Sequence, residues 1–319
     1  MLDIVGKRYW YFLLSLLVIV PGVIFMIINW QRAGSPLLLG IDFTGGSLLQ
    51  LQFKDAAPQP GAVKAVLDQH GFGDALVQTG RSRPDVSSDD TISIRTKTMD
   101  QPTKNAIETD LRGRFGDFTE LRFESVGPSV GAEVSQRAFL AVLLASIGIL
   151  AYISFAFRQV PNAFRYGACA IIAMLHDVLV VVGMGAIFGY FFGWEVDALF
   201  LTALLTVIGF SVHDTIVVFD RIRENMLRFR GEPFERVVNH SIIQTLDRSI
   251  NTSLTVIFSL TALTLFGGAT IKSFVVFLLI GIVSGTYSSI FNAAPLLVVW
   301  HNGEVRRLLG RTRGQAVTA

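Results

Sequence analysis

Long apolar segments without charge dominate this chain and restrict it to a membrane fold. Residues 9–31 contain no charged side chain, and residues 138–157 form a second uncharged run. Each run reaches the roughly 20 residues that an α-helix needs to cross the hydrocarbon core of a bilayer. Only 16% of all residues are charged, against about 25% in a typical soluble domain. The composition therefore excludes a soluble globular protein.

Hydropathy predicts six membrane-spanning helices, at about residues 10–30, 138–157, 166–194, 198–219, 250–268 and 274–300. The first is expected to be a retained span, because it is longer than the apolar region of a signal peptide and lacks a small-residue cleavage site. We expect a cytoplasmic N-terminus and first helix at 1–31, an extracytoplasmic domain at 32–137, five further helices at 138–300 and a cytoplasmic tail at 301–319.

The basic residues predict which loops lie in the cytoplasm, because Lys and Arg are enriched in short cytoplasmic loops. The opposite short loops carry only Glu195, Asp197 and Lys272 as charged residues. We therefore expect both termini on the cytoplasmic side. The basic residues on that side are Lys7, Arg8, Arg158, Arg165, Arg221, Arg223, Arg228, Arg230, Arg236, Arg248, Arg306, Arg307, Arg311 and Arg313.

The long segment between the first two spans is predicted to be a compact α/β domain. Its patterns indicate strands near 49–53, 75–79, 92–94 and 121–123 and helices at 62–70 and 102–115. The order β-α-β-β-α-β is that of a ferredoxin-like unit. The sequence offers no metal-ligand cluster, cofactor motif or basic patch here, so we expect no metal, no cofactor, no catalysis and no nucleic-acid binding.

Two acidic residues, Asp177 and Asp214, lie inside apolar spans. A carboxylate in hydrocarbon is costly, so such a residue is a functional candidate by default. For Asp214 we expect proton uptake and release with Arg248 as charge partner, because burial favours the protonated form of a carboxyl and a guanidinium favours the ionised form. The alternative is that Asp214 only hydrogen-bonds a neighbouring helix. For Asp177 and the adjacent His176, one could serve a proton path while the other makes a structural hydrogen bond.

Polar residues recur at helical spacing in the same spans. Thr202, Thr206, Gly209 and His213 follow one face of the fourth span, and Gly281, Gly285 and Ser289 form a small-residue face on the sixth. The fifth span adds a further stripe after Arg248. We expect these faces to share an interior contact. The polar residues predicted to line it are Thr206, Asn251, Thr252 and Thr255.

Five motifs, in order along the chain, resemble the SecF protein-export subunits of the SecD/SecF family in the resistance-nodulation-division superfamily. They are residues 40–46 (GIDFTGG), 126–131 (VGPSVG), 176–178 (HDV), 214–225 (DTIVVFDRIREN) and 244–253 (QTLDRSINTS). The first lacks the Lys of a P-loop, so a tight turn explains its glycines better than phosphate binding does. We expect the first two motifs to shape the backbone or to form a hinge for the external domain. The residues concerned are Gly40, Asp42, Phe43, Gly45, Gly46, Gly127, Pro128 and Gly131.

The resemblance implies a multi-pass subunit of the bacterial inner membrane that uses the proton-motive force to assist protein export. The implied partners are SecD, the SecYEG channel, the translocating preprotein and the proton, with YajC and YidC as further candidates. It also implies that Asp214 and Arg248 belong to the proton path, whereas the principal proton-carrying aspartate belongs to SecD. His213 stands where many relatives carry Asn, and it either joins the relay or is a polar neighbour.

Two other functions are compatible with the same scaffold. A proton-coupled transporter of small hydrophobic molecules or lipids would need a pocket or channel through the external domain. A passive scaffold would leave Asp214 and Arg248 without a purpose beyond packing. The single small external domain favours protein export over the transport of small molecules.

Overall fold

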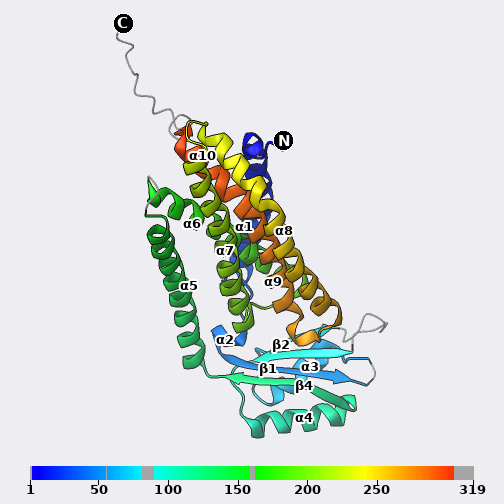
Figure 1. Cartoon of the computed structure of the whole chain (residues 1–319). Helices are drawn as coiled ribbons and strands as arrows, with labels where there is room; N and C mark the ends of the chain where they lie inside the picture. Colours follow the sequence, from blue (N-terminus) through cyan, green and yellow to red (C-terminus); the bar gives the residue numbers. More distant parts are fainter. Residues whose placement is uncertain (1, 55, 81–89, 159–161, 305–319) are drawn as a thin grey trace. The chain divides into compact units, whose positions relative to one another are not determined.

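The computed structural model describes residues 2–54, 56–80, 90–158 and 162–304 (Figure 1). The chain divides into two compact units, each described here by itself. The helical unit comprises Met1–Leu38 and Ala141–Ala319, and the α/β unit comprises Leu39–Leu140. From residue 305 onward the predicted cytoplasmic tail lies outside the described residues.

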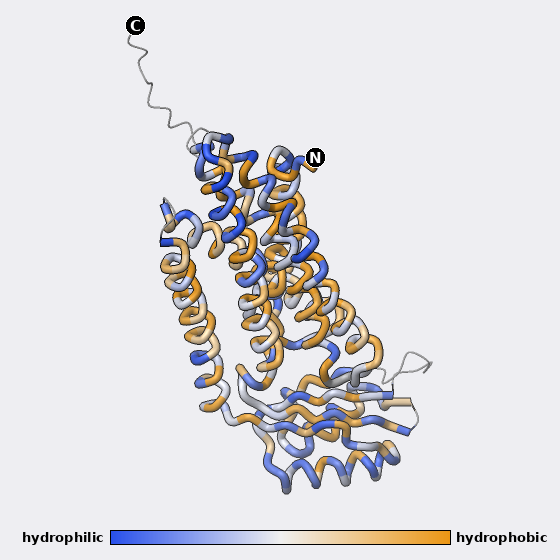
Figure 2. The backbone as a smooth tube through the Cα atoms, viewed as in Figure 1, coloured by the Kyte–Doolittle hydropathy of each residue, from blue (hydrophilic) through white to orange (hydrophobic). Residues whose placement is uncertain are grey.

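Six helical spans in the described residues are long and apolar enough to cross a membrane, which confirms the number predicted from hydropathy. Figure 2 shows the middle of these helices as predominantly hydrophobic, with hydrophilic residues gathered at the end that carries the N-terminal segment. The helices are α1 (Arg8–Ala33), α5 (Pro128–Ala156), α6 (Ala163–Phe192), α7 (Ala198–Arg228), α8 (Phe234–Phe266) and a last span made of α9 (Ala269–Ser288) and α10 (Ala294–His301).

Four of these spans differ from the sequence prediction. Helix α5 begins at Pro128 and not near residue 138, and α7 continues to Arg228 and not only to residue 219. Helix α8 begins at Phe234, directly after Pro233, and continues without a break into the fifth span that was predicted to start near residue 250. The sixth span contains a π-helix, η2 (Ser289–Ala293), between α9 and α10. Pro295 stands in the first turn of α10. Its ring has no N–H and clashes with the carbonyl four residues earlier, so the hydrogen-bond ladder widens there.

The centre of the helical unit is formed by α6, α7 and the last span. In each of these three spans, between 44 and 50% of an apolar stretch of 18 residues is buried. The corresponding share is only 6 to 17% in α1, α5 and α8. Helices α7 and α9 both pack against α6 and against each other. A polar residue on the inner faces of these three helices is therefore shielded by the chain itself.

The α/β unit has the predicted order of strands and helices. Its elements are α2 (Ile41–Thr44), β1 (Gly46–Phe53), α3 (Pro60–Gln69), β2 (Leu76–Gly80), β3 (Thr91–Thr96), α4 (Gln101–Phe115) and β4 (Phe118–Val126). The strands form one antiparallel sheet in the order β2-β3-β1-β4. Alternate residues of β1 and β3, such as Leu51 and Ile94, pack against Val66 of α3 and Leu111 of α4 to form the core.

Candidate functional site

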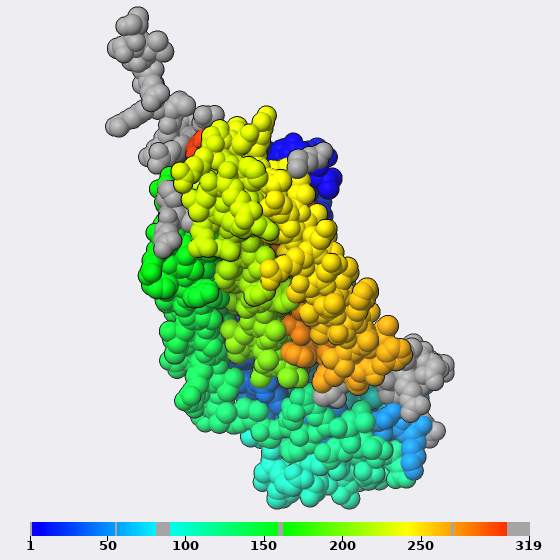
Figure 3. Space-filling view, in the orientation of Figure 1, coloured from blue at the N-terminus to red at the C-terminus, as the bar shows by residue number. Residues whose placement is uncertain are grey.

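An exposed polar face runs along α7 and α8, which lie side by side in Figure 3. On α7 it consists of Thr202, Thr206, Gly209 and His213, and on α8 of Arg248, Asn251, Thr252 and Thr255, all exposed in this chain. The hydroxyls of Thr206 and Thr252 each donate to a carbonyl of their own helix at 2.8 Å. The expectation that these stripes meet in the interior of this chain is therefore wrong. They face away from its own bundle.

Asp214 lies just behind this face. Its exposed fraction is 3%, and its Oδ2 atom is buried without a hydrogen-bond partner. The nearest ionisable group is His213, whose Nδ1 atom lies 3.9 Å from Asp214 Oδ1 and whose side chain is 65% exposed. No ion pair within 4.0 Å joins Asp214 to Arg248 among the described residues, although Arg248 is near enough to attract its charge. Arg248, expected from the sequence as the charge partner of Asp214, is therefore near it but makes no direct ion pair with it in this structure.

The chemistry open to Asp214 follows from these contacts. An ionised carboxylate that is buried without hydrogen bonds carries a large desolvation cost. That cost is removed either by a proton or by a partner that reaches the carboxylate. Asp214 is therefore a group whose charge depends on what covers the polar face.

Asp177 is the opposite case. It is completely buried, and three serine hydroxyls donate to it: Ser211 to Oδ2 at 2.5 Å, Ser288 to Oδ2 at 2.6 Å and Ser284 to Oδ1 at 2.7 Å. His176 Nδ1 lies 3.0 Å from Oδ1. These five residues, which we call the Asp177 cluster, join α6, α7 and α9 at the centre of the helical unit.

The three serines were not among the residues predicted for the site. Their signal in the sequence is weak, because serine is common on the small-residue faces that allow helices to approach closely. That close approach is itself present. A Cβ atom on Gly285 would lie 3.0 Å from Ser211 Cβ, and one on Gly281 would collide with Val207. The hydroxyl partners of Asp177 could not be chosen without knowing how the helices are rotated.

The two glycine-containing motifs meet within the α/β unit. Gly45 and Gly46 have positive φ angles of 71° and 119°, a conformation that favours glycine. A Cβ atom on Gly45 would lie 2.8 Å from Pro128 Cα, and one on Gly46 would lie 2.5 Å from the carbonyl oxygen of Thr96. Gly40 precedes α2, which contains Asp42 and Phe43, and Gly127 precedes α5. The glycines of these motifs therefore allow backbone segments to approach closely, which is an architectural role.

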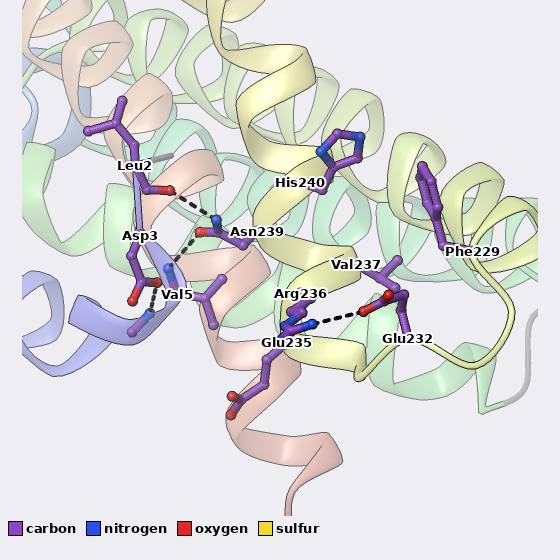
Figure 4. A pocket seen from close by; sticks show the side chains of 11 residues that line it. Leu2, Asp3, Val5, Phe229, Glu232, Glu235, Arg236, Val237, Asn239 and His240 are labelled. Carbon is purple, nitrogen blue, oxygen red and sulfur yellow. Dashed lines mark hydrogen bonds and ion pairs between the residues drawn. The ribbon is translucent and has the colours of Figure 1, made fainter.

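A cavity of about 580 Å³ lies at the end of the helical unit that carries the N-terminus (Figure 4). Its polar groups fasten the N-terminal segment to α8. The Asn239 side chain accepts from the N–H groups of Ile4 and Val5 at 2.8 and 3.2 Å and donates to the carbonyl of Leu2 at 2.9 Å. None of the intramembrane candidates lines this cavity. Across the described ranges, no group of three or more His, Cys, Asp or Glu residues is placed to hold a metal ion.

Two protein-family models match the chain. The one described as "Protein export membrane protein SecD/SecF, C-terminal" covers residues 106–303, and the one described as "SecD/SecF GG Motif" covers residues 33–57. The second range includes the turn formed by Gly45 and Gly46. The first includes both intramembrane aspartates and the polar face.

Similar proteins match along nearly the whole chain. The protein translocase subunit SecF of Thermobaculum terrenum is 55% identical over 321 residues, covering 99% of this chain and 99% of the relative. The same subunit of Anaerolinea thermophila is 51% identical over 314 residues, covering 98% of each. Among solved structures, the translocon-associated membrane protein SecDF of Thermus thermophilus gives a TM-score of 0.79 at 30% identity, covering 94% of this chain and 39% of that chain.

Proposed function

Because the chain belongs to the SecD/SecF family of protein export membrane proteins and matches its SecF members along nearly its whole length, we propose that it is an accessory subunit of Sec protein export. It works with SecD and uses the proton-motive force to assist the passage of secretory proteins through SecYEG. The chain spans 39% of the solved SecDF chain, so a SecD-like part has to supply the rest of the working unit.

The observation that carries this proposal is the polar face next to Asp214. His213, Arg248 and a row of threonines are exposed on α7 and α8, two helices that are long and apolar enough to cross a membrane. Ionisable side chains within a bilayer face a protein partner or a water-filled cavity, because contact with lipid is costly. A second membrane subunit that covers this face removes that cost. SecD is the partner that the family supplies.

Coupling then follows from the charge of Asp214. With its Oδ2 atom unpartnered, the protonated form suits the shielded position. When the partner admits water or brings a donor, Asp214 releases the proton and attracts Arg248 on α8. The two states differ in the charge between α7 and α8, and alternating between them converts proton flow into helix movement. His213 places an imidazole beside this site, with Nδ1 3.9 Å from Asp214 Oδ1.

The same proposal includes location and orientation. The chain is a multi-pass protein, which we place in the bacterial inner membrane with both termini in the cytoplasm, following its basic loops. YajC and YidC are further candidate partners, which only the family resemblance suggests. The exported polypeptide is the expected substrate of the external domain.

Transport of small hydrophobic molecules is the weaker alternative. Such a transporter needs a passage through its external domain. Here the α/β unit is filled by its core, in which Leu51, Val66 and Leu111 have no exposed surface. This packing favours protein export.

The test is proton-driven export in inverted membrane vesicles that contain this chain, SecD and SecYEG. Asp214→Asn keeps the shape of the side chain but removes the ionisable group, and we expect the stimulation by a proton gradient to be lost. Asp220→Asn is the matched control on the same helix, because Asp220 is exposed and pairs with Arg223 at 2.7 Å. Full stimulation in Asp214→Asn would overturn the coupling role. A membrane complex purified without SecD would overturn the partnership.

A further inference from the structure

The Asp177 cluster contains a buried acid that the coupling scheme does not use. In helices, serine and threonine hydroxyls commonly donate to a carbonyl of their own preceding turn, as Thr206 does. Ser211 and Ser284 instead donate across to Asp177 on α6. Each hydroxyl has one proton to give, so both are committed to this carboxylate. The cluster is therefore an interhelical connection made by directed hydrogen bonds.

Directed bonds restrict rotation in a way that apolar packing does not. Helices α7 and α9 approach closely at Gly285, where an added Cβ would lie 3.0 Å from Ser211 Cβ. Contacts between small residues let the backbones approach closely, but they contain no directed bond that selects one rotation of a helix. The bond from Ser211 to Asp177 fixes which side of α7 faces α6. The bonds from Ser284 and Ser288 do the same for α9.

Ser211 lies three residues before Asp214 on α7, about 4.5 Å along the helix axis. Both are buried, with 1% and 3% of their surfaces exposed, whereas the side chain of His213 is 65% exposed. Adjacent residues on a helix point about 100° apart. A turn of α7 by one residue would therefore exchange the environments of His213 and Asp214. The hydrogen bond at Ser211 opposes that turn.

We propose that the Asp177 cluster is a positioning device that holds Asp214 in its shielded place and so sets the proton affinity of that residue. The inference rests on the proposed proton-coupling function and adds Ser211, Ser284 and Ser288 to it as positioning residues. Asp177 itself carries no transported proton in this scheme, because its oxygens are saturated by donors. The ionisable groups that act on Asp214 are His213 on its own helix and Arg248 on α8. The pair His176–Asp177 on α6 is linked to α7 through Ser211. Helix α9 contributes the hydroxyl groups of Ser284 and Ser288 to the cluster.

The experiment is a pH titration of Asp214 by infrared difference spectroscopy, on the full chain with SecD in lipid nanodiscs. The carboxyl band of Asp214 is identified by its loss in Asp214→Asn. Ser211→Ala removes one bond of the cluster, and we expect the titration midpoint to move by about one pH unit or more, a tenfold change in proton affinity. The pH profile of proton-driven export should move in the same direction. Asp177→Asn should have the larger effect.

Ser289→Ala is the matched control. Ser289 is completely buried on the same span, and its hydroxyl donates to the carbonyl of Thr286 in its own helix at 3.0 Å. We expect this variant to leave the midpoint unchanged. If Asp177→Asn does not fold, the single-hydroxyl variants Ser211→Ala and Ser284→Ala decide the question.

The two proposals fail in different ways. A band of Asp214 that does not titrate in the unmodified protein overturns the coupling function. A band that titrates normally and keeps its midpoint in folded Ser211→Ala and Ser284→Ala overturns the positioning role. Faster hydrogen exchange of α7 amides with an unchanged midpoint also overturns it, because the cluster would then support the fold alone.

Discussion

A Cβ atom placed on Gly131 would lie 2.6 Å from the backbone nitrogen of Gly45, so the segment after the first span and the first turn of α5 touch backbone to backbone. Real Cβ atoms do not occupy such positions, so Gly131 cannot be replaced without moving Gly45, and a Cβ atom on Gly45 would in turn lie 2.8 Å from Pro128 Cα. The contact explains why both motifs contain glycine. A hinge at these motifs would have to break this contact. We call the close contact between Gly45 and Gly131 the clasp.

Gly131→Ala is expected to destabilise the clasp by about 1–3 kcal/mol, the usual cost of overpacking a closed site. Gly127→Ala is the control inside the same motif, because a Cβ atom there meets nothing within 4 Å. Thermal unfolding of the full chain in mild detergent measures the difference. Equal melting temperatures for the two variants would contradict the backbone contact.

The Asn239 side chain fastens the N-terminal segment with three hydrogen bonds, to Ile4, Val5 and Leu2. Asn239→Ala leaves these backbone groups without a partner, at a cost of about 1–3 kcal/mol for each one that stays buried. We expect the amides of Ile4 and Val5 to exchange hydrogen at least tenfold faster. Asn105→Ala, at an exposed position that bonds Gln101 within α4, serves as the control. Unchanged exchange in Asn239→Ala would show that other contacts hold the segment.

The sequence predicts the spans and the α/β order because both depend on hydrophobic periodicity, which neighbouring residues determine. Leu49, Leu51 and Phe53 alternate as a strand with one face in a core must, and all three are buried. The break at η2 depends instead on how Pro295 disturbs the turn before it. Hydropathy, which averages over a span, does not detect it.

The sequence predicts the site less well than the fold. The spacing of residues shows which of them share a face of a helix, but it does not show what that face packs against. Thr202, Thr206 and His213 do share one face of α7, as expected, and that face is exposed. Asp177 and Asp214 look alike in sequence. The structure separates them by their partners, since three serines from two other helices surround the first and none reaches Oδ2 of the second. Such long-range contacts leave no local pattern.

The α/β unit contains a half-buried acid, Glu108, whose effect on stability depends on pH. Glu108 lies beside Lys104, with 3.3 Å between Oε1 and Nζ, and Lys104 also contacts Glu120. Burial raises the pKa of Glu108 above its ordinary 4.5, with Lys104 opposing the shift. The folded unit therefore prefers the protonated carboxyl. Its stabilising contribution is complete below pH 4.5 and is lost as the pH rises through the raised pKa.

Glu108→Gln should make the α/β unit more stable than the unmodified protein at neutral pH and should flatten the pH dependence of its stability above pH 4.5. Hydrogen exchange of β1 amides in the full chain, corrected for the intrinsic effect of pH, gives the free energy of opening. Glu133→Gln removes an exposed partner of Arg137 and should change little, as surface pairs do. A Glu108→Gln protein that loses stability at neutral pH would mean that its bond to Lys104 outweighs the cost of burial.

Arg248 is exposed on the polar face and acts on Asp214 without touching it, which predicts graded effects of its replacement. Arg248→Lys keeps the charge and should retain part of the proton-driven export. Arg248→Gln removes the charge and should reduce that export about tenfold or more, the effect of losing roughly 1.4 kcal/mol of attraction. Arg236→Gln is the control, because Arg236 pairs with Glu232 at the end of α8, away from the polar face. If Arg248→Lys fails as completely as Arg248→Gln, the planar guanidinium itself is required, and Arg248 must then meet a carboxylate directly in another state of the cycle.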